Sequence, residues 1–159
     1  ARGAVCEHRV IGLRVDRSEH ALVEPLGFNR SSLRFKSELI ETIKDLGVAD
    51  RVRIVHDTFH HILAGGGEFF PEHTGIVHIS AVVDPALAVD QMEDEHRVLV
   101  GEEDRLENAQ QISALLAAGY DGPVSYECFA PETQQLTNPK EAIAASFAFI
   151  ESRITAEAL

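Results

Sequence analysis

The stretch Val52-Arg53-Ile54-Val55-His56-Asp57-Thr58-Phe59-His60-His61 takes an apolar segment directly into a cluster of one carboxylate and three imidazoles. The apolar part, residues 52–55, predicts a buried β-strand. Parallel strands bury their middle residues and present functional side chains at their C-terminal ends. Asp57 and His60 are three residues apart, so both can reach one point above this strand. The end of this strand is therefore the first candidate for a functional site.

Similar apolar segments recur along the chain and alternate with helical patterns. Strands are predicted over residues 21–24, 53–57, 75–80 and 122–126. Such alternation implies parallel strands joined by right-handed crossovers. We therefore predict an α/β fold of about four β/α units, which is half of a (β/α)8 barrel.

Helix boundaries are marked by capping residues. Ser31 or Ser32 is expected to cap the first helix, and Gly47 to end it. A second helix runs from Asn108 to Ala118, and Asn138-Pro139 opens the last one. Residues 63–72, around a glycine triplet, are expected to form a loop or a broken helix.

The chain divides into a short opening segment and one long domain. Residues 1–20 show no clear period of two or 3.6, and we expect a partial helix and loop there. Residues 21–159 are predicted to form the half-barrel that carries the site. Within it, residues 84–107 form a long acidic connection, and connections of this length usually serve a function.

Composition excludes several classes of protein. The 159 residues carry 26 acidic against 14 basic side chains and a net charge of -12, which argues against a nucleic-acid partner. No apolar run reaches the roughly 18–20 residues that span a bilayer, so no membrane partner is expected. Cys6 and Cys128 form no disulfide framework, and no signal-peptide pattern opens the sequence. A reduced, cytoplasmic setting is predicted.

Four predicted strands end in, or carry near their ends, a side chain that can bind a metal: Glu24, Asp57, His78 and Glu127. The C-terminal ends of parallel barrel strands lie on one face, so we expect these groups to converge. Three carboxylates and one imidazole suit one divalent metal ion, Mn²⁺, Mg²⁺ or Co²⁺, with Zn²⁺ also possible. His60 lies one short step beyond Asp57 and could bind substrate instead.

Each of these residues also has a purely structural interpretation. Glu24 alone reads as a solvated loop residue, His78 as a hydrogen-bonded core histidine and Asp57 as a helix cap. His56 and His61 are interpreted as structural. The glycine triplet lacks the Lys-Ser/Thr of a phosphate-binding loop, so a flexible turn is expected. The metal site is favoured because four successive strands each supply a ligand type.

At these residues the sequence resembles the xylose-isomerase-like superfamily of sugar isomerases and epimerases, closest to the inosose (2-keto-myo-inositol) isomerase type. The resemblance covers about residues 21–155 and corresponds to the second half of that barrel. The matching pieces are Val23-Glu24-Pro25-Leu26-Gly27, residues 55–60, residues 77–80, Asp94-Glu95-His96-Arg97-Val98, residues 119–127 and Phe129-Ala130-Pro131-Glu132. Residues 101–104 depart from the usual Gly-x-Gly loop.

The resemblance implies roles for six residues. It places a divalent metal on Glu24, Asp57, His78 and Glu127, and it assigns contacts with substrate oxygens to His60 and Arg97. The implied reaction is the isomerisation or epimerisation of a polyol ketone or keto-sugar, by proton transfer through an enediolate. Glu24 and Glu127 are the expected catalytic acid and base.

Three alternatives stay open. A dehydratase of the same superfamily would lose a β-hydroxyl from the enediolate. A metal-dependent endonuclease is disfavoured by the net charge of -12. A truncated half-barrel could bind a metal, a sugar or a partner chain without turnover. A half-barrel sheet also leaves two open edges, so a homo-oligomer is expected.

Overall fold

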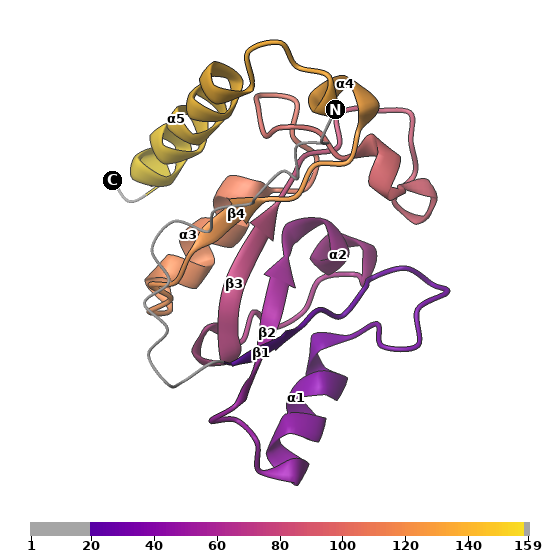
Figure 1. Ribbon diagram of the computed structural model, residues 1–159, viewed down its shortest axis with the longest axis vertical. Coiled ribbons are helices and arrows are strands. Elements are labelled where there is room, and N and C mark those ends of the chain that lie inside the picture. Colours follow the sequence, from indigo (N-terminus) through magenta and orange to yellow (C-terminus); the bar gives the residue numbers. More distant parts are fainter. Residues whose placement is uncertain (1–19, 158–159) are drawn as a thin grey trace, which may run out of the picture.

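The computed structural model describes residues 20–157 as one parallel sheet with helices packed against it (Figure 1). The strands are β1 (Ala21–Val23), β2 (Val52–Asp57), β3 (Thr74–Ile79) and β4 (Val124–Tyr126). The helices are α1 (Lys36–Leu46), α2 (Thr58–Leu63), α3 (Asn108–Ala117), α4 (Pro131–Gln134) and α5 (Pro139–Glu157), with 3-10 turns at Pro71–His73, Val89–Gln91 and Asp94–His96. None of the helices within the described range is both long and apolar enough to cross a membrane.

The four strands pair in chain order, and every pairing is parallel. Asp57 of β2 lies in register with His78 of β3. Beyond the end of β4, the Glu127 N–H donates to the Ile79 carbonyl at 3.0 Å, which extends the alignment to the last predicted site residue. The predicted α/β class and its four β/α units are confirmed.

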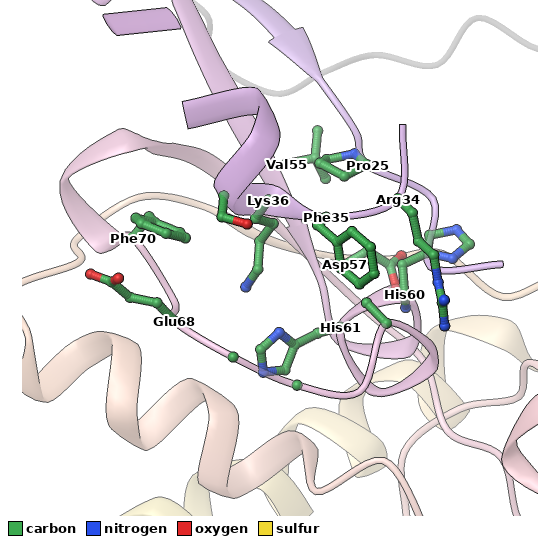
Figure 2. A pocket seen from close by; sticks show the side chains of 14 residues that line it. Pro25, Arg34, Phe35, Lys36, Val55, Asp57, His60, His61, Glu68 and Phe70 are labelled. Carbon is green, nitrogen blue, oxygen red and sulfur yellow. Dashed lines mark hydrogen bonds between the residues drawn. The ribbon is translucent and has the colours of Figure 1, made fainter. Parts of the chain in front are cut away.

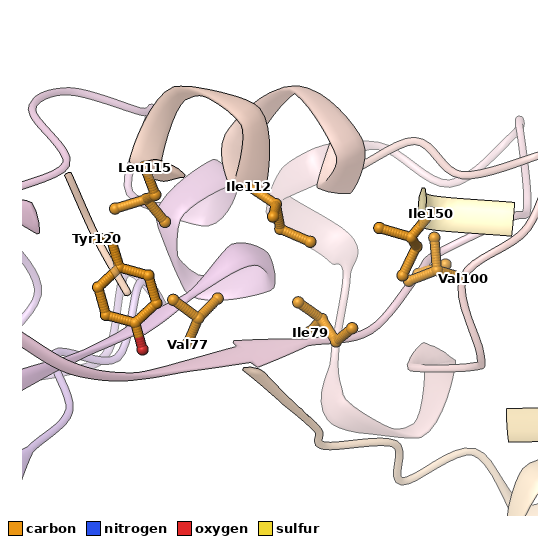
Figure 3. Packing of buried hydrophobic residues seen from close by; sticks show 8 residues of the cluster. Val77, Ile79, Val100, Ile112, Leu115, Tyr120 and Ile150 are labelled. Atoms are coloured by element: carbon orange, nitrogen blue, oxygen red, sulfur yellow. The ribbon is translucent and has the colours of Figure 1, made fainter. Parts of the chain in front are cut away.

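The main hydrophobic core lies on one face of the sheet. Val77 and Ile79 of β3 pack against Ile112 and Leu115 of α3, and Ile150 of α5 closes the cluster (Figure 3). Side chains alternate between the two faces of a strand. His78, between the two core residues, therefore points to the face opposite α3.

The start of α1 differs from the sequence prediction. Ser31 and Ser32 do not cap it, because the helix begins at Lys36 after an extended Phe35. The chain before it is held by Arg34, whose guanidinium donates to the carbonyls of Gly27 and Leu63 at 2.9 Å each. These bonds keep the segment after β1 out of a helix. The predicted end at Gly47 is confirmed, with the glycine in the left-handed conformation at φ 61°.

Two sequence expectations remain predictions. The partial helix and loop expected over residues 1–20 falls almost entirely outside the described residues. Within the described range, β1 and β4 each pair with a strand on one side only. These edges are compatible with the expected homo-oligomer.

Gly27 fixes the distance between the segment after β1 and helix α2. A Cβ built there would lie 2.1 Å from the His60 carbonyl oxygen and 2.8 Å from the Leu63 Cβ. We expect Gly27→Ala to lower the free energy of unfolding by about 1–3 kcal/mol, because the added methyl meets backbone that cannot move aside. Urea unfolding measures this loss.

Gly101→Ala is the matched control, because a Cβ at Gly101 meets nothing within 4 Å. Equal stabilities of the two variants would contradict the close approach at Gly27.

Candidate metal centre

The structure brings the four predicted metal ligands together. One ligand atom from each of Glu24, Asp57, His78 and Glu127 lies within 4.8 Å of the other three. His78 Nδ1 is central, at 3.7 Å from Glu24 Oε1 and 3.6 Å from Glu127 Oε2. The four side chains come from four separate strand ends, as the parallel topology requires.

Local sequence places each ligand at its strand end. Glu24 directly follows β1, and Pro25 after it cannot donate a ladder hydrogen bond. Asp57 closes β2 and also caps α2, since its Oδ1 accepts the His60 N–H at 3.0 Å. The helix-cap interpretation of Asp57 is therefore correct alongside its position in the ligand group.

The donor set and its spacing fit a divalent cation. Ligand atoms about 2.1 Å from one ion lie roughly 3–4.3 Å apart, so this group needs to contract by only about half an ångström at its widest pair. Glu24 Oε1 and His78 Nδ1 are buried and have no hydrogen-bond partner. Buried polar atoms are normally satisfied, so two orphaned ligand atoms facing each other indicate a site shaped for a further group.

Arg97 stands directly behind two of the ligands. Its side chain is fully buried, and its NH2 group donates to Asp57 Oδ2 at 2.5 Å and lies 3.1 Å from Glu127 Oε2. Nε donates to Ser80 Oγ at 2.9 Å, and NH1 to Asp94 Oδ1 at 3.2 Å. The guanidinium therefore holds the ligand carboxylates in place. Its predicted contact with substrate oxygens stays a prediction.

Two aromatic rings enclose this arginine. The guanidinium carbon lies 4.7 Å from the ring centroid of Phe59 and 5.2 Å from that of Phe129. Both rings present the cation with an attractive face and exclude water from its pairs with the carboxylates. The geometry of the ligand group thus rests on a rigid support.

The charges of the group are strongly coupled. Burial alone lowers the pKa of His78, but the carboxylates of Glu127 and Glu24 outweigh it and raise the pKa to about 10. The close approach of His78, whose Nδ1 lies 3.6 Å from Glu127 Oε2, and the charge of Arg97 lower the pKa of Glu127 to about 2 against its burial. Burial raises the pKa of Asp57 to about 7, with Arg97 opposing. A divalent cation would take over the role of the His78 proton and displace it.

His60 lies beside the ligand group with its ring edge-on to Phe28 and Phe59, both at 5.1 Å between centroids. Burial and then the charge of Arg97 lower the pKa of His60 to about 4, so the ring is neutral at physiological pH. Its Nδ1 is buried without a hydrogen-bond partner. This atom is available to a ligand, and the predicted substrate contact remains a prediction.

Sequence reasoning missed the residues that support the ligands. Ser80 and Asp94 each accept a hydrogen bond from Arg97, and Phe129 covers it. For Asp94 a signal existed, because an acidic residue three positions before an arginine can pair with it. For Ser80 and Phe129 only the folded structure identifies the partner.

Residues 15–153 match a family model described as a xylose isomerase-like TIM barrel. The chain belongs to this family. No curated protein matches the sequence.

Several solved structures share the fold. A xylose isomerase domain containing protein from Salmonella typhimurium LT2 is 31% identical, with a TM-score of 0.65, over 86% of this chain and 48% of that one. The IolI protein, solved with a bound zinc atom, is 23% identical with a TM-score of 0.71, over 86% and 49%. A xylose isomerase domain protein from Alicyclobacillus acidocaldarius is 24% identical with a TM-score of 0.66, over 86% and 50%. The chain spans about half the length of these proteins.

Removing the Arg97 guanidinium should destabilise the protein strongly. Arg97→Met leaves the buried Asp57 carboxylate without its charged partner, and breaking such a pair costs about 3–5 kcal/mol of unfolding free energy. Urea unfolding of chelator-treated protein measures the loss. Arg51→Met is the control, since Arg51 lies exposed at 3.8 Å from Asp50 and its loss should cost no more than about 0.5 kcal/mol. Equal losses of unfolding free energy in the two variants would contradict a stabilising role for the buried pair of Arg97 and Asp57.

His78 should make stability fall at alkaline pH. Its pKa in the folded chain, about 10, lies above the ordinary value of 6.5, so protonated His78 stabilises the fold fully below pH 6.5. This contribution is lost as the pH rises through 10. The free energy of unfolding of chelator-treated protein, measured with urea between about pH 6 and 10, should therefore fall more steeply for wild type than for His78→Gln, whose side chain does not titrate. Parallel profiles would rule out the His78 charge as the cause.

Proposed function

We propose that this chain provides the divalent-metal centre of a sugar or inositol-ketone isomerase or epimerase. The observation that carries the proposal is the convergence of Glu24, Asp57, His78 and Glu127 within 4.8 Å. Membership of the xylose isomerase-like family agrees with this chemistry. The inosose isomerase type gives the first substrate to test, 2-keto-myo-inositol.

The donor set narrows the choice of metal. Three carboxylates and one imidazole suit Mn²⁺, Mg²⁺, Co²⁺ or Zn²⁺. The IolI structure holds a zinc atom, which makes Zn²⁺ the first ion to test on this chain. Bound in the site, the cation would supply Lewis-acid polarisation of the substrate carbonyl.

The two glutamates are positioned to move the proton. Glu24 and Glu127 lie on either side of His78, at 3.7 and 3.6 Å from its Nδ1. One carboxylate removes the proton from the carbon next to the carbonyl, and the other returns a proton to the neighbouring carbon or to the opposite face. The two carboxylates are not equivalent, because Arg97 lies 3.1 Å from Glu127 Oε2 while Glu24 Oε1 has no hydrogen-bond partner.

Neutral His60 and buried Arg97 complete the arrangement. The free Nδ1 of His60 offers a hydrogen bond to a hydroxyl or carbonyl oxygen of the substrate. Arg97 adds a fixed positive charge behind Asp57 and Glu127, which favours negative charge developing on the substrate oxygens. The dehydratase alternative uses the same first proton transfer, and product analysis separates it, because a dehydratase releases water from the carbon skeleton.

Glu24→Gln and Glu127→Gln should each weaken Zn²⁺ binding and abolish proton exchange. Losing a ligand should cost more affinity than the roughly 10–100-fold that loss of an outer-sphere partner costs. Calorimetric titration with Zn²⁺ measures the first effect. The second is measured by incubating 2-keto-myo-inositol with the zinc-loaded chain in D₂O, where wild type should place deuterium on the carbon next to the carbonyl.

Glu132→Gln is the control, because Glu132 is exposed in the first turn of α4. Unchanged zinc affinity in both Glu24→Gln and Glu127→Gln would refute the metal site. Zinc binding without deuterium incorporation in wild type would leave the site standing and refute proton transfer on this substrate.

A further inference from the structure

A cavity adjoins the metal centre. It has a volume of about 130 Å³ and lies between the start of α1, helix α2 and the loop that follows α2. Figure 2 shows the Lys36 side chain reaching into it toward the His61 ring, with Glu68 and Phe70 on the other side. Asp57 and His60 belong to its wall, so the cavity shares these residues with the metal centre and its surroundings.

The Lys36 amine is held by a hydrogen-bond chain of defined direction. Gln111 Nε2 donates to the carbonyls of Thr58 and Leu106, at 3.2 and 2.6 Å, which fixes its amide orientation. Gln111 Oε1 therefore faces His56 Nε2 at 2.9 Å as an acceptor, and Nε2 carries the proton. His56 Nδ1 is left as an acceptor, 2.9 Å from Lys36 Nζ.

This environment differs from that of an ordinary lysine. Among the described residues, no carboxylate lies within ion-pair distance of Lys36, and its hydrogen-bond partner is an imidazole. Burial lowers the pKa of Lys36 to about 7, and the charge of Glu68 only partly opposes this. With this pKa, about half of the Lys36 amines are unprotonated at pH 7, and an unprotonated lysine amine is a nucleophile.

His61 provides a second free group in the same cavity. Its side chain is 7% exposed, and its Nδ1 is buried with no hydrogen-bond partner. Burial and the nearby Lys36 charge lower the pKa of His61 to about 4, so the ring is neutral and can take up a proton transiently. A nucleophile, a group that orients it and a proton carrier thus surround one small space.

We propose that Lys36 is a reactive amine that forms an imine with a small aldehyde bound in this cavity. The amine nitrogen bonds to the carbonyl carbon while the carbonyl π electrons move to oxygen. His61 takes the proton that nitrogen loses and delivers it to this oxygen, giving a carbinolamine. A second proton passes the same way, the hydroxyl leaves as water, and the carbon–nitrogen double bond closes. No oxidant or reductant is consumed.

The cavity suits a ligand of a few heavy atoms. Its volume is close to the roughly 150 Å³ of an engineered protein cavity that binds benzene. A two- or three-carbon hydroxyaldehyde fits this volume, and its hydroxyl can use the polar wall.

The chain offers a direct test because it contains only three lysines, Lys36, Lys44 and Lys140, and the last two are exposed. Glycolaldehyde with sodium cyanoborohydride converts each imine into a stable secondary amine, which peptide mapping by mass spectrometry assigns to a residue. At pH 7 we expect Lys36 to be modified at least about tenfold faster than the other two, because an ordinary lysine is only about 0.04% unprotonated at this pH. Raising the pH should reduce the difference in modification rate between Lys36 and the two exposed lysines, because the exposed amines lose their protons as well.

His61→Gln tests the proton carrier, and it should slow the modification of Lys36 by about tenfold while leaving Lys44 and Lys140 unchanged. Lys36→Arg confirms the peptide assignment, because it removes the adduct. A Lys36 rate in wild type equal to or below that of the exposed lysines at pH 7 would overturn the proposal. An unchanged Lys36 rate in His61→Gln would overturn the role given to His61.

Discussion

The buried guanidinium of Arg97 is the interaction on which the ligand group depends. Three carboxylates directed at one point repel one another, and this arginine supplies a fixed positive charge within 3.1 Å of both Asp57 and Glu127. Phe59 and Phe129 keep water away from it, which strengthens the attraction. The fold can therefore hold the carboxylates of these strands close together, and β2 and β4 are tied through one side chain as well as through the sheet.

The positions of the four ligands could be predicted because they follow from topology. Parallel strands end on one side of a sheet, so a ligand type at each predicted strand end had to face its neighbours. Gly47 was predictable for a similarly local reason, since a left-handed residue ends α1. The predicted serine caps were wrong because the segment before α1 forms a turn and bends, held by hydrogen bonds from Arg34 to distant carbonyls. No local pattern contains that information.

The surroundings of the ligands could not be predicted, because they depend on contacts between distant segments. His56, which the sequence suggested to be structural, joins Gln111 of α3 to Lys36 of α1 across 55 and 20 positions. Neighbouring His56 and Asp57 point to opposite faces of β2, so His56 meets Lys36 and Gln111 while Asp57 joins the ligand group. The alternation of side chains follows from the strand itself, but which partner each residue meets depends on how the helices pack against it.

Asp57 joins the site to the backbone in a further way. One of its oxygens accepts the His60 N–H at the start of α2, and the other accepts from Arg97, which leaves lone pairs free for a cation. A cation bound by this carboxylate would share it with the start of α2, so local fraying of α2 and loss of the cation would be thermodynamically linked. The rate at which the His60 amide exchanges its hydrogen with solvent would consequently report whether the cation site is occupied, without any substrate or chromophore.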